Sequence, residues 1–276
     1  MADRMTGSLA DPALARILVA NDDGIDAPGL ELLERVARSL SPDVWIVAPE
    51  QEQSGAGHSL TTRRPIRLTE IAPHRYVVDG TPTDCVLLGL KRLLRGRPPT
   101  LVLSGVNAGT NIAEDLTYSG TCAAAIEATL FGIPAIALSQ EYRDRGSIPW
   151  GAAEAFAAEA IRRIVAAASP WPKDTFFNVN FPAAAPAMVR GFAVTRQGKR
   201  ILGDNLTEGR DPRGRQYYWI GPAQMTGGVE PGTDLAAIAD ARVSITPVHV
   251  NMTHVAVAEG LRQALESPAL ESQASG

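Results

Sequence analysis

The first part of the chain alternates between short apolar runs and segments with apolar residues at helical spacing. Residues 17–20 form a continuous apolar run, as expected for a strand buried on both faces. The run ends in the turn Asn-Asp-Asp-Gly at 21–24, and a helical pattern begins at Pro28. Its apolar positions are Leu30, Leu33, Val36, Ala37 and Leu40. This pattern predicts a strand, an acidic turn and a helix.

The same alternation continues to about residue 182. We expect further strands at 43–48, 101–103, 133–138 and 175–179, a hairpin at 65–78, and helices at 81–94, 119–132 and 152–168. Strands and helices that alternate in this way predict a doubly wound α/β fold with a mostly parallel sheet.

Beyond residue 182 the alternation stops. Strands are expected at 192–195, 216–220 and 243–246, separated by long polar connections. We interpret this part as a protruding antiparallel arm suited to subunit contacts. The basic residues between the first two strands favour a solvated hairpin over a polyanion site. The expected organisation is one domain at 15–265, with its core at about 15–190, the arm at about 191–250, and loose termini at 1–14 and 266–276.

Polar side chains follow three of the predicted strands at their carboxyl ends, where open parallel sheets bind ligands. Asp22 and Asp23 follow the first strand, Ser54 lies in the loop after the second, and Asn107 follows the strand at 101–103. All four are oxygen donors, which suit Mg²⁺ or Mn²⁺, with Ca²⁺ also compatible. A solvated Asx-type turn at 21–24 is the alternative, and the turn alone does not decide between the two.

A candidate anion site precedes the helix at 119–132. Ser119, Gly120 and Thr121 open this helix after a long loop rich in glycine and small polar residues. Free backbone amides at a helix N-terminus form a phosphate site. Simple N-capping by Ser119 or Thr121 is the alternative, and the two roles are compatible. A metal site beside an anion site favours transfer of a phosphoryl group to water.

Composition limits the classes of partner and the compartment that we expect for the chain. The chain has 276 residues and a net charge of −4, which disfavours nucleic-acid polymers but not small phosphorylated molecules. No apolar run approaches 18 residues, so we expect no membrane span, and the first dozen residues lack the order of a signal peptide. Cys85 and Cys122 lie in apolar helical contexts, which favours a reducing compartment, the cytoplasm.

Several segments together resemble the SurE family of stationary-phase survival proteins. They are Asn-Asp-Asp-Gly at 21–24, Ala-Pro at 48–49 with Ser-Gly at 54–55, Gly-Thr-Pro-Thr-Asp-Cys at 80–85, Ser-Gly-Val-Asn-Ala-Gly at 104–109, Tyr-Ser-Gly-Thr at 118–121, Val-Thr-Arg-Gln-Gly at 194–198 and Ser-Ile-Thr-Pro at 244–247. Their fixed order over most of the chain makes the resemblance more specific than any one motif.

The resemblance implies a metal-dependent nucleotidase that releases phosphate from nucleoside 5′- and 3′-monophosphates. It implies a Rossmann-like, three-layer α/β/α core and an arm exchanged between subunits of a homodimer or homotetramer. The implied metal ligands are Asp22, Asp23, Ser54 and Asn107, with Asp22 and Asp23 also catalytic. The implied phosphate-binding residues are Asn111, Ser119, Gly120 and Thr121.

Two other functions were weighed against this one. A metal-dependent nucleotide-binding or regulatory protein with weak or no catalysis has the same binding residues, and the sequence shows no evident general acid. A nicotinamide-dependent oxidoreductase is disfavoured, because the dinucleotide glycine fingerprint is missing after the first strand. The preferred base and sugar position, the metal, and the identity of the attacking group stay open at this stage.

Overall fold

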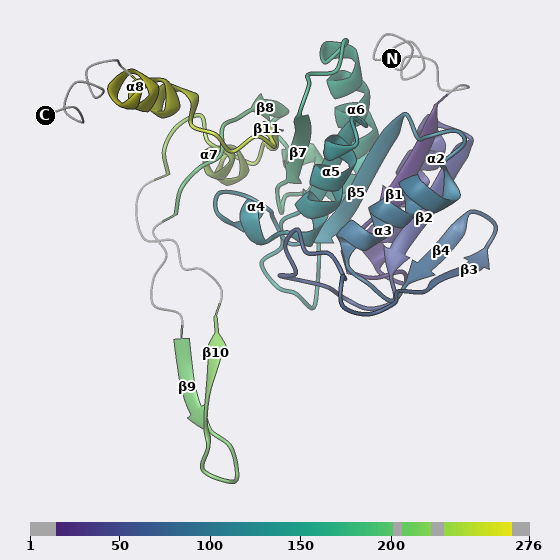
Figure 1. Ribbon diagram of the computed structural model, residues 1–276, viewed down its shortest axis with the longest axis horizontal. Helices are drawn as coiled ribbons and strands as arrows, with labels where there is room; N and C mark the ends of the chain where they lie inside the picture. The colour runs from purple at the N-terminus through teal and green to yellow at the C-terminus, as the bar shows by residue number, and fades with distance from the viewer. Residues whose placement is uncertain (1–14, 201–205, 222–228, 267–276) are drawn as a thin grey trace, which may run out of the picture.

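A nine-stranded sheet forms the body of the molecule in the computed structural model, which describes residues 15–200, 206–221 and 229–266 (Figure 1). The strand order is β3-β4-β2-β1-β5-β6-β7-β11-β8. The strands are β1 Arg16–Ala20, β2 Asp43–Pro49, β3 Leu68–Ala72, β4 Arg75–Val78, β5 Leu101–Ala108, β6 Ala135–Gln140, β7 Thr175–Phe181, β8 Phe192–Val194 and β11 Val243–His249. The strands from β4 to β7 in this order are all parallel. The predicted mostly parallel α/β sheet is confirmed.

Helices cover both faces of the sheet, because alternate residues of each buried strand point to opposite sides. Ile17 and Val19 of β1 pack with α2 (Pro28–Leu40) and α6 (Gly151–Ala167) on one face. Leu18 and Ala20 pack on the other face with α3 (Pro82–Leu88), the π-helical turn η1 (Gly89–Leu93) and α5 (Gly120–Leu130). The continuous apolar run at 17–20 therefore serves two cores, as a doubly covered strand requires.

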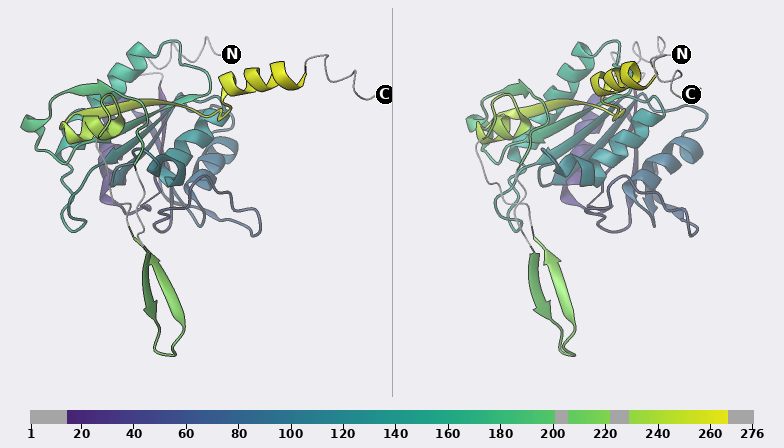
Figure 2. Two further views of the ribbon diagram at one scale, coloured as in Figure 1. Left: turned by 90° about the vertical axis from the view of Figure 1, so that its left-hand side faces the viewer. Right: turned by 60° about the vertical axis from the view of Figure 1, so that its left-hand side comes forward.

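The predicted arm is much smaller than 191–250. Strand β11 pairs antiparallel with β7, and β8 pairs parallel with β11, so both extend the main sheet. The short helix α7 (Asp234–Ala239) packs beside them. Within the described part of 191–250, the two-stranded hairpin of β9 (Leu206–Arg210) and β10 (Gln216–Ile220) stands apart from the body (Figure 2). The predicted boundary between core and arm at 190 was wrong. Long polar connections separate β8 and β11 from the rest of the sheet in sequence, so the local pattern gave no sign of their pairing.

Four helical segments were not predicted: α7, α4 (Asp115–Tyr118), the 3-10 turn η2 (Pro186–Met188) and α8 (Val255–Leu265). Helix α8 has no buried residue and extends away from the sheet (Figure 1). Within the described ranges no helix is long and apolar enough to cross a membrane. The loose termini expected at 1–14 and beyond Glu266 lie outside the described residues.

Candidate functional site

Hydrogen bonds join three loops and the start of α5 at the carboxyl ends of β1, β2 and β5. The backbone amide of Gln53 donates to the carbonyl oxygen of Asp22 at 2.8 Å. The amide of Ala108 donates to Oδ2 of Asp23 at 3.0 Å, and the hydroxyl of Thr121 donates to Oδ1 of Asp22 at 2.6 Å. The acidic turn is thus the point where these predicted segments meet.

The turn at 21–24 is closed by its own asparagine. Nδ2 of Asn21 donates to the carbonyl oxygen of Gly24 at 2.7 Å, and Gly24 has a φ of +101°, a conformation that favours glycine. This is not an Asx turn, in which the side-chain oxygen accepts a backbone amide, because Oδ1 of Asn21 is buried and accepts no hydrogen bond from the described residues. The expectation of a solvated turn is also wrong, because Asp22 is only 4% exposed.

Burial and neighbouring negative charge both disfavour the ionised forms of the two adjacent carboxylates. Burial, followed by the charge of Asp23, raises the pKa of Asp22 to about 7, although hydrogen bonds from Thr121 work the other way. Burial also raises the pKa of Asp23, against the opposing effect of the amide of Ala108. A cation between the two carboxylates would relieve both the desolvation and the mutual repulsion.

The other two predicted metal ligands lie one residue away from the amides that bind the acidic turn. Ser54 follows Gln53, is exposed, and donates its hydroxyl to Oε1 of Glu52 at 2.8 Å. Asn107 precedes Ala108 and donates through Nδ2 to the carbonyl oxygen of Gly109 at 2.8 Å. This bond occupies the amide nitrogen of Asn107 and leaves its oxygen as the possible metal ligand.

The start of α5 packs directly on Asp22. A Cβ atom at Gly120 would lie 2.7 Å from Cβ of Asp22, so only glycine lets the helix approach this closely. The hydroxyl of Ser119 accepts the amide of Cys122 at 3.0 Å and caps the helix. The capping interpretation is therefore correct for Ser119, whereas the hydroxyl of Thr121 serves Asp22 instead.

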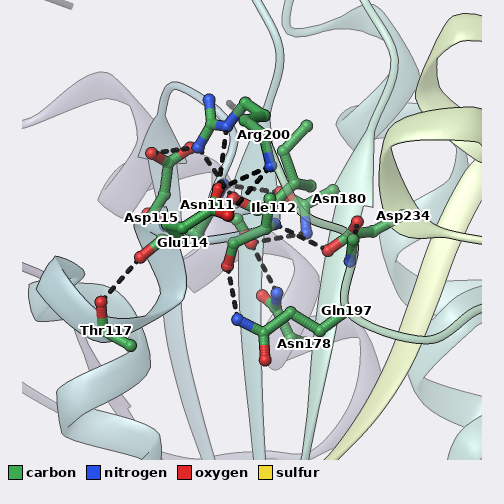
Figure 3. Close-up of polar contacts among 12 residues, drawn as sticks. Asn111, Ile112, Glu114, Asp115, Thr117, Asn178, Asn180, Gln197, Arg200 and Asp234 are labelled. Atoms are coloured by element: carbon green, nitrogen blue, oxygen red, sulfur yellow. Dashed lines mark hydrogen bonds and ion pairs between the residues drawn. The ribbon is translucent and has the colours of Figure 1, made fainter. Parts of the chain in front are cut away.

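Asn111 lies deeper, across the ends of β6 and β7. Its side-chain nitrogen donates to the hydroxyl of Ser139 at 2.8 Å, and its backbone amide donates to Oδ1 of Asn180 at 2.8 Å. Its carbonyl oxygen accepts Nδ2 of Asn178 at 2.6 Å (Figure 3). Asn111 is thus buried and fixed, next to the loop that carries Asn107.

The sequence analysis missed several residues of this region. Asn178 and Asn180 are fully buried polar residues in a strand that is otherwise largely apolar, and that contrast was a usable signal. Glu52 faces the acidic pair and is bound by Arg145 at 2.6 Å. No local pattern marks Arg145, because it reaches the site from a distant loop.

The donor set fits a hard cation. Among the described residues no three His, Cys, Asp or Glu side chains form a ready metal cluster. A cation here would take two carboxylates, neutral oxygens from serine and asparagine, and water. Mg²⁺ and Mn²⁺ accept such a shell, and a sulfur-preferring metal does not.

The chain is similar to known proteins over most of its length. The family model for survival protein SurE matches residues 17–204. A 5′-nucleotidase SurE from Paramagnetospirillum magneticum is 53% identical over 246 residues, covering 89% of this chain and 94% of its own. One from Parvibaculum lavamentivorans is 49% identical and covers 91% of each chain. A crystal structure of the SurE protein from Aquifex aeolicus matches with a TM-score of 0.80 at 38% identity, covering 91% of this chain and all of its own.

Proposed function

The chain belongs to the SurE family, and we propose that it is a 5′-nucleotidase that acts with a divalent cation at Asp22 and Asp23. Hydrolysis of nucleotide phosphate esters is the activity named for relatives that are 49–53% identical over most of the chain. The observation that carries the site is the pair of a buried Asp22 and a partly buried Asp23 against the N-terminus of α5. Hydrolysis of 3′-monophosphates is part of the proposal.

Asp22, Asp23, Ser54 and Asn107 would hold Mg²⁺ or Mn²⁺, and Ca²⁺ also suits these oxygen donors. When bound, such a cation polarises a phosphoryl oxygen and lowers the pKa of water. The protein's own part is orientation: Thr121 fixes one oxygen of Asp22, and Ala108 fixes one oxygen of Asp23.

The phosphate group would lie against the first turn of α5. The positive end of the helix dipole attracts anions, and Gly120 brings it beside the acidic pair. Asn111 supplies a buried, fixed amide at the neighbouring strand ends. These groups would hold the ester so that its phosphorus faces the carboxylates, and hydrolysis replaces the P–O bond to the nucleoside by one to oxygen from water.

Phosphate release tests the proposal directly. The purified chain is expected to release inorganic phosphate from a panel of nucleoside 5′- and 3′-monophosphates. Chelation with EDTA should abolish the activity, and excess Mn²⁺ or Mg²⁺ should restore it. A chain that binds monophosphates with metal but releases no phosphate would instead be a nucleotide-binding protein, the alternative weighed above.

The hairpin of β9 and β10 supports a further part of the proposal, a homodimer or homotetramer. Tyr217, Tyr218, Trp219 and Ile220 form one run on β10, and the side chains of Trp219 and Ile220 are 69% and 87% exposed. An isolated two-stranded hairpin is marginal in water. Packing on a second copy, through exchange of this hairpin, would cover the run. The exposed apolar residues of α8 fit the same explanation.

Charging the hairpin is expected to dissociate the assembly. Wild type should sediment as a dimer or larger species at micromolar concentration, and Trp219→Asp should sediment as a smaller one. Arg213→Glu is the matched control, since it adds negative charge at the hairpin turn, away from the aromatic run. A wild-type monomer at this concentration would contradict the proposal.

A cytoplasmic location completes the proposal. Cys85 and Cys122 are both free and buried. Burial raises the pKa of the Cys122 thiol to about 12, which keeps it protonated and unreactive. Such cysteines suit a reducing compartment.

A further inference from the structure

The segment 111–115 connects the two halves of the proposed phosphate site. It begins at Asn111 and ends at Asp115, whose carbonyl oxygen accepts the amide of Ser119 at 2.9 Å. Any shift of this segment therefore moves Asn111 at one end and the start of α5 at the other. Its own residues form no strand and only the start of α4, so contacts from other segments hold it in place.

Arg200 binds three residues of the segment, Ile112, Glu114 and Asp115 (Figure 3). Its guanidinium donates to the carbonyl oxygen of Ile112 at 3.0 Å and forms an ion pair with Asp115. Its backbone amide donates to both carboxylate oxygens of Glu114, at 2.9 and 3.1 Å. The side chain of Arg200 is only 10% exposed. A planar guanidinium can make several directed bonds at once, which a lysine ammonium on the same stem cannot reproduce.

Residues near Arg200 make further hydrogen bonds to the segment 111–115. Nε2 of Gln197 donates to the carbonyl oxygen of Ala113 at 2.8 Å. The fully buried carboxylate of Asp234 accepts the amide of Ala113 at 2.9 Å through one oxygen and the amide of Gly198 at 2.8 Å through the other. Asp234 thus ties the segment to the stretch 197–200 itself.

The electrostatics support a tight contact. Burial alone would raise the pKa of Glu114, but hydrogen bonds, including those from Arg200, hold that pKa below its usual value. Glu114 therefore stays ionised opposite the arginine. Removing the guanidinium would leave Asp115 without its cation and Ile112 without its donor, and groups stranded in this way favour rearrangement of the segment.

We propose that Arg200 is a positioning residue that sets the geometry of the phosphate site by holding 111–115. The inference rests on the proposed function only in the assignment of Asn111 and the start of α5 to phosphate. Among the described residues the side chain of Arg200 bonds to Ile112, Glu114 and Asp115, and it bonds neither carboxylate of the acidic pair. Its loss should therefore weaken phosphate binding and leave metal binding unchanged.

The test compares Arg200→Met with Arg196→Met. Arg196 is the matched control, because it lies on the same stretch but pairs with Glu230 and has a half-exposed side chain. In saturating Mn²⁺, Arg200→Met is expected to weaken the affinity for inorganic phosphate about tenfold, the scale of one lost hydrogen bond, and to raise KM for a nucleoside monophosphate in parallel. The fall in kcat should be smaller. The rise in melting temperature on adding Mn²⁺ without phosphate should match that of wild type.

Two results would overturn the proposal. One is a lower melting temperature with wild-type phosphate affinity, which would make Arg200 purely structural. The other is an equal loss of phosphate affinity in Arg196→Met, which would make the effect one of general charge. If Arg200→Met does not fold, Arg200→Lys is the second variant. It keeps the positive charge but lacks the planar guanidinium with its several N–H donors, so it should still weaken phosphate binding. A wild-type chain that hydrolysed no nucleotide would contradict the proposed function, while the phosphate affinities would still decide on Arg200.

Discussion

Asp22→Asn is expected to abolish nucleotide hydrolysis and, at the same time, to raise the melting temperature of the metal-free protein. Asparagine has the same shape and can still accept the hydroxyl of Thr121, so the packing around residue 22 should survive. It removes the buried charge that repels Asp23. Metal affinity should fall with the charge, because a hard cation depends on carboxylate ligands. Asp23→Asn should act in the same direction.

The stabilisation should depend on pH in a defined sense. The pKa of Asp22 is about 7 in the folded protein and 3.8 in the unfolded chain. Between these two pH values the folded state therefore retains a proton that the unfolded chain has released. The free energy of unfolding of the metal-free wild type therefore falls as pH rises from about 4 to about 7, by on the order of 4 kcal/mol. Above pH 7 the effect is constant.

Thermal melting in EDTA at several pH values measures this effect. Asp22→Asn should melt several degrees above wild type at pH 8, and the difference should shrink toward pH 4. Asp26→Asn is the control, because Asp26 lies just beyond the same turn but is exposed. Full activity in Asp22→Asn, or a metal-induced melting shift equal to that of wild type, would rule out the assigned role.

Thr121→Val is expected to lower kcat by about 10- to 100-fold, the scale of losing the hydrogen bond that orients a metal ligand. Valine keeps the shape of threonine but cannot donate to Oδ1 of Asp22, so this carboxylate loses its fixed orientation. The cost in folding stability should be about 1 kcal/mol. Turnover and thermal melting of the same preparation measure the two effects separately.

Ser119→Ala provides the comparison. Its hydroxyl caps α5 through the amide of Cys122, and losing a cap costs about 1 kcal/mol. The two variants should thus have similar melting temperatures and very different turnover. Equal turnover in both would mean that Thr121 contributes only to the stability of the helix.

Local pattern was enough to predict the sheet up to β7 and the acidic turn. The run at 17–20 specifies a doubly buried strand by its own residues, and the position of Asp22 and Asp23 follows from where that run ends. The role of the turn in gathering the loops also follows, because parallel strands bring their carboxyl ends to one edge.

Pairing between distant segments was not predictable in the same way. Nothing near Val243 shows that β11 lies beside β7, because its partner is far away in the sequence. Asp234 looks like an ordinary first-turn helix residue, yet both of its oxygens hold amides of other segments. The hydroxyl of Thr121 was expected to cap the helix or to bind phosphate. Its bond to Asp22 was not predictable, because it depends on how closely α5 approaches the acidic turn.

The contacts that hold the segment 111–115 have a consequence for synthesis of the chain on the ribosome. Every candidate metal and phosphate residue has been translated once Thr121 is made. The contacts that fix the segment come from residues 84 to 121 positions further along the chain than their partners. A nascent or truncated chain that ends before Gln197 therefore carries every candidate metal and phosphate residue but none of these contacts to 111–115. We expect activity to appear only when these late, long-range contacts have formed, so that unfinished chains should be inactive.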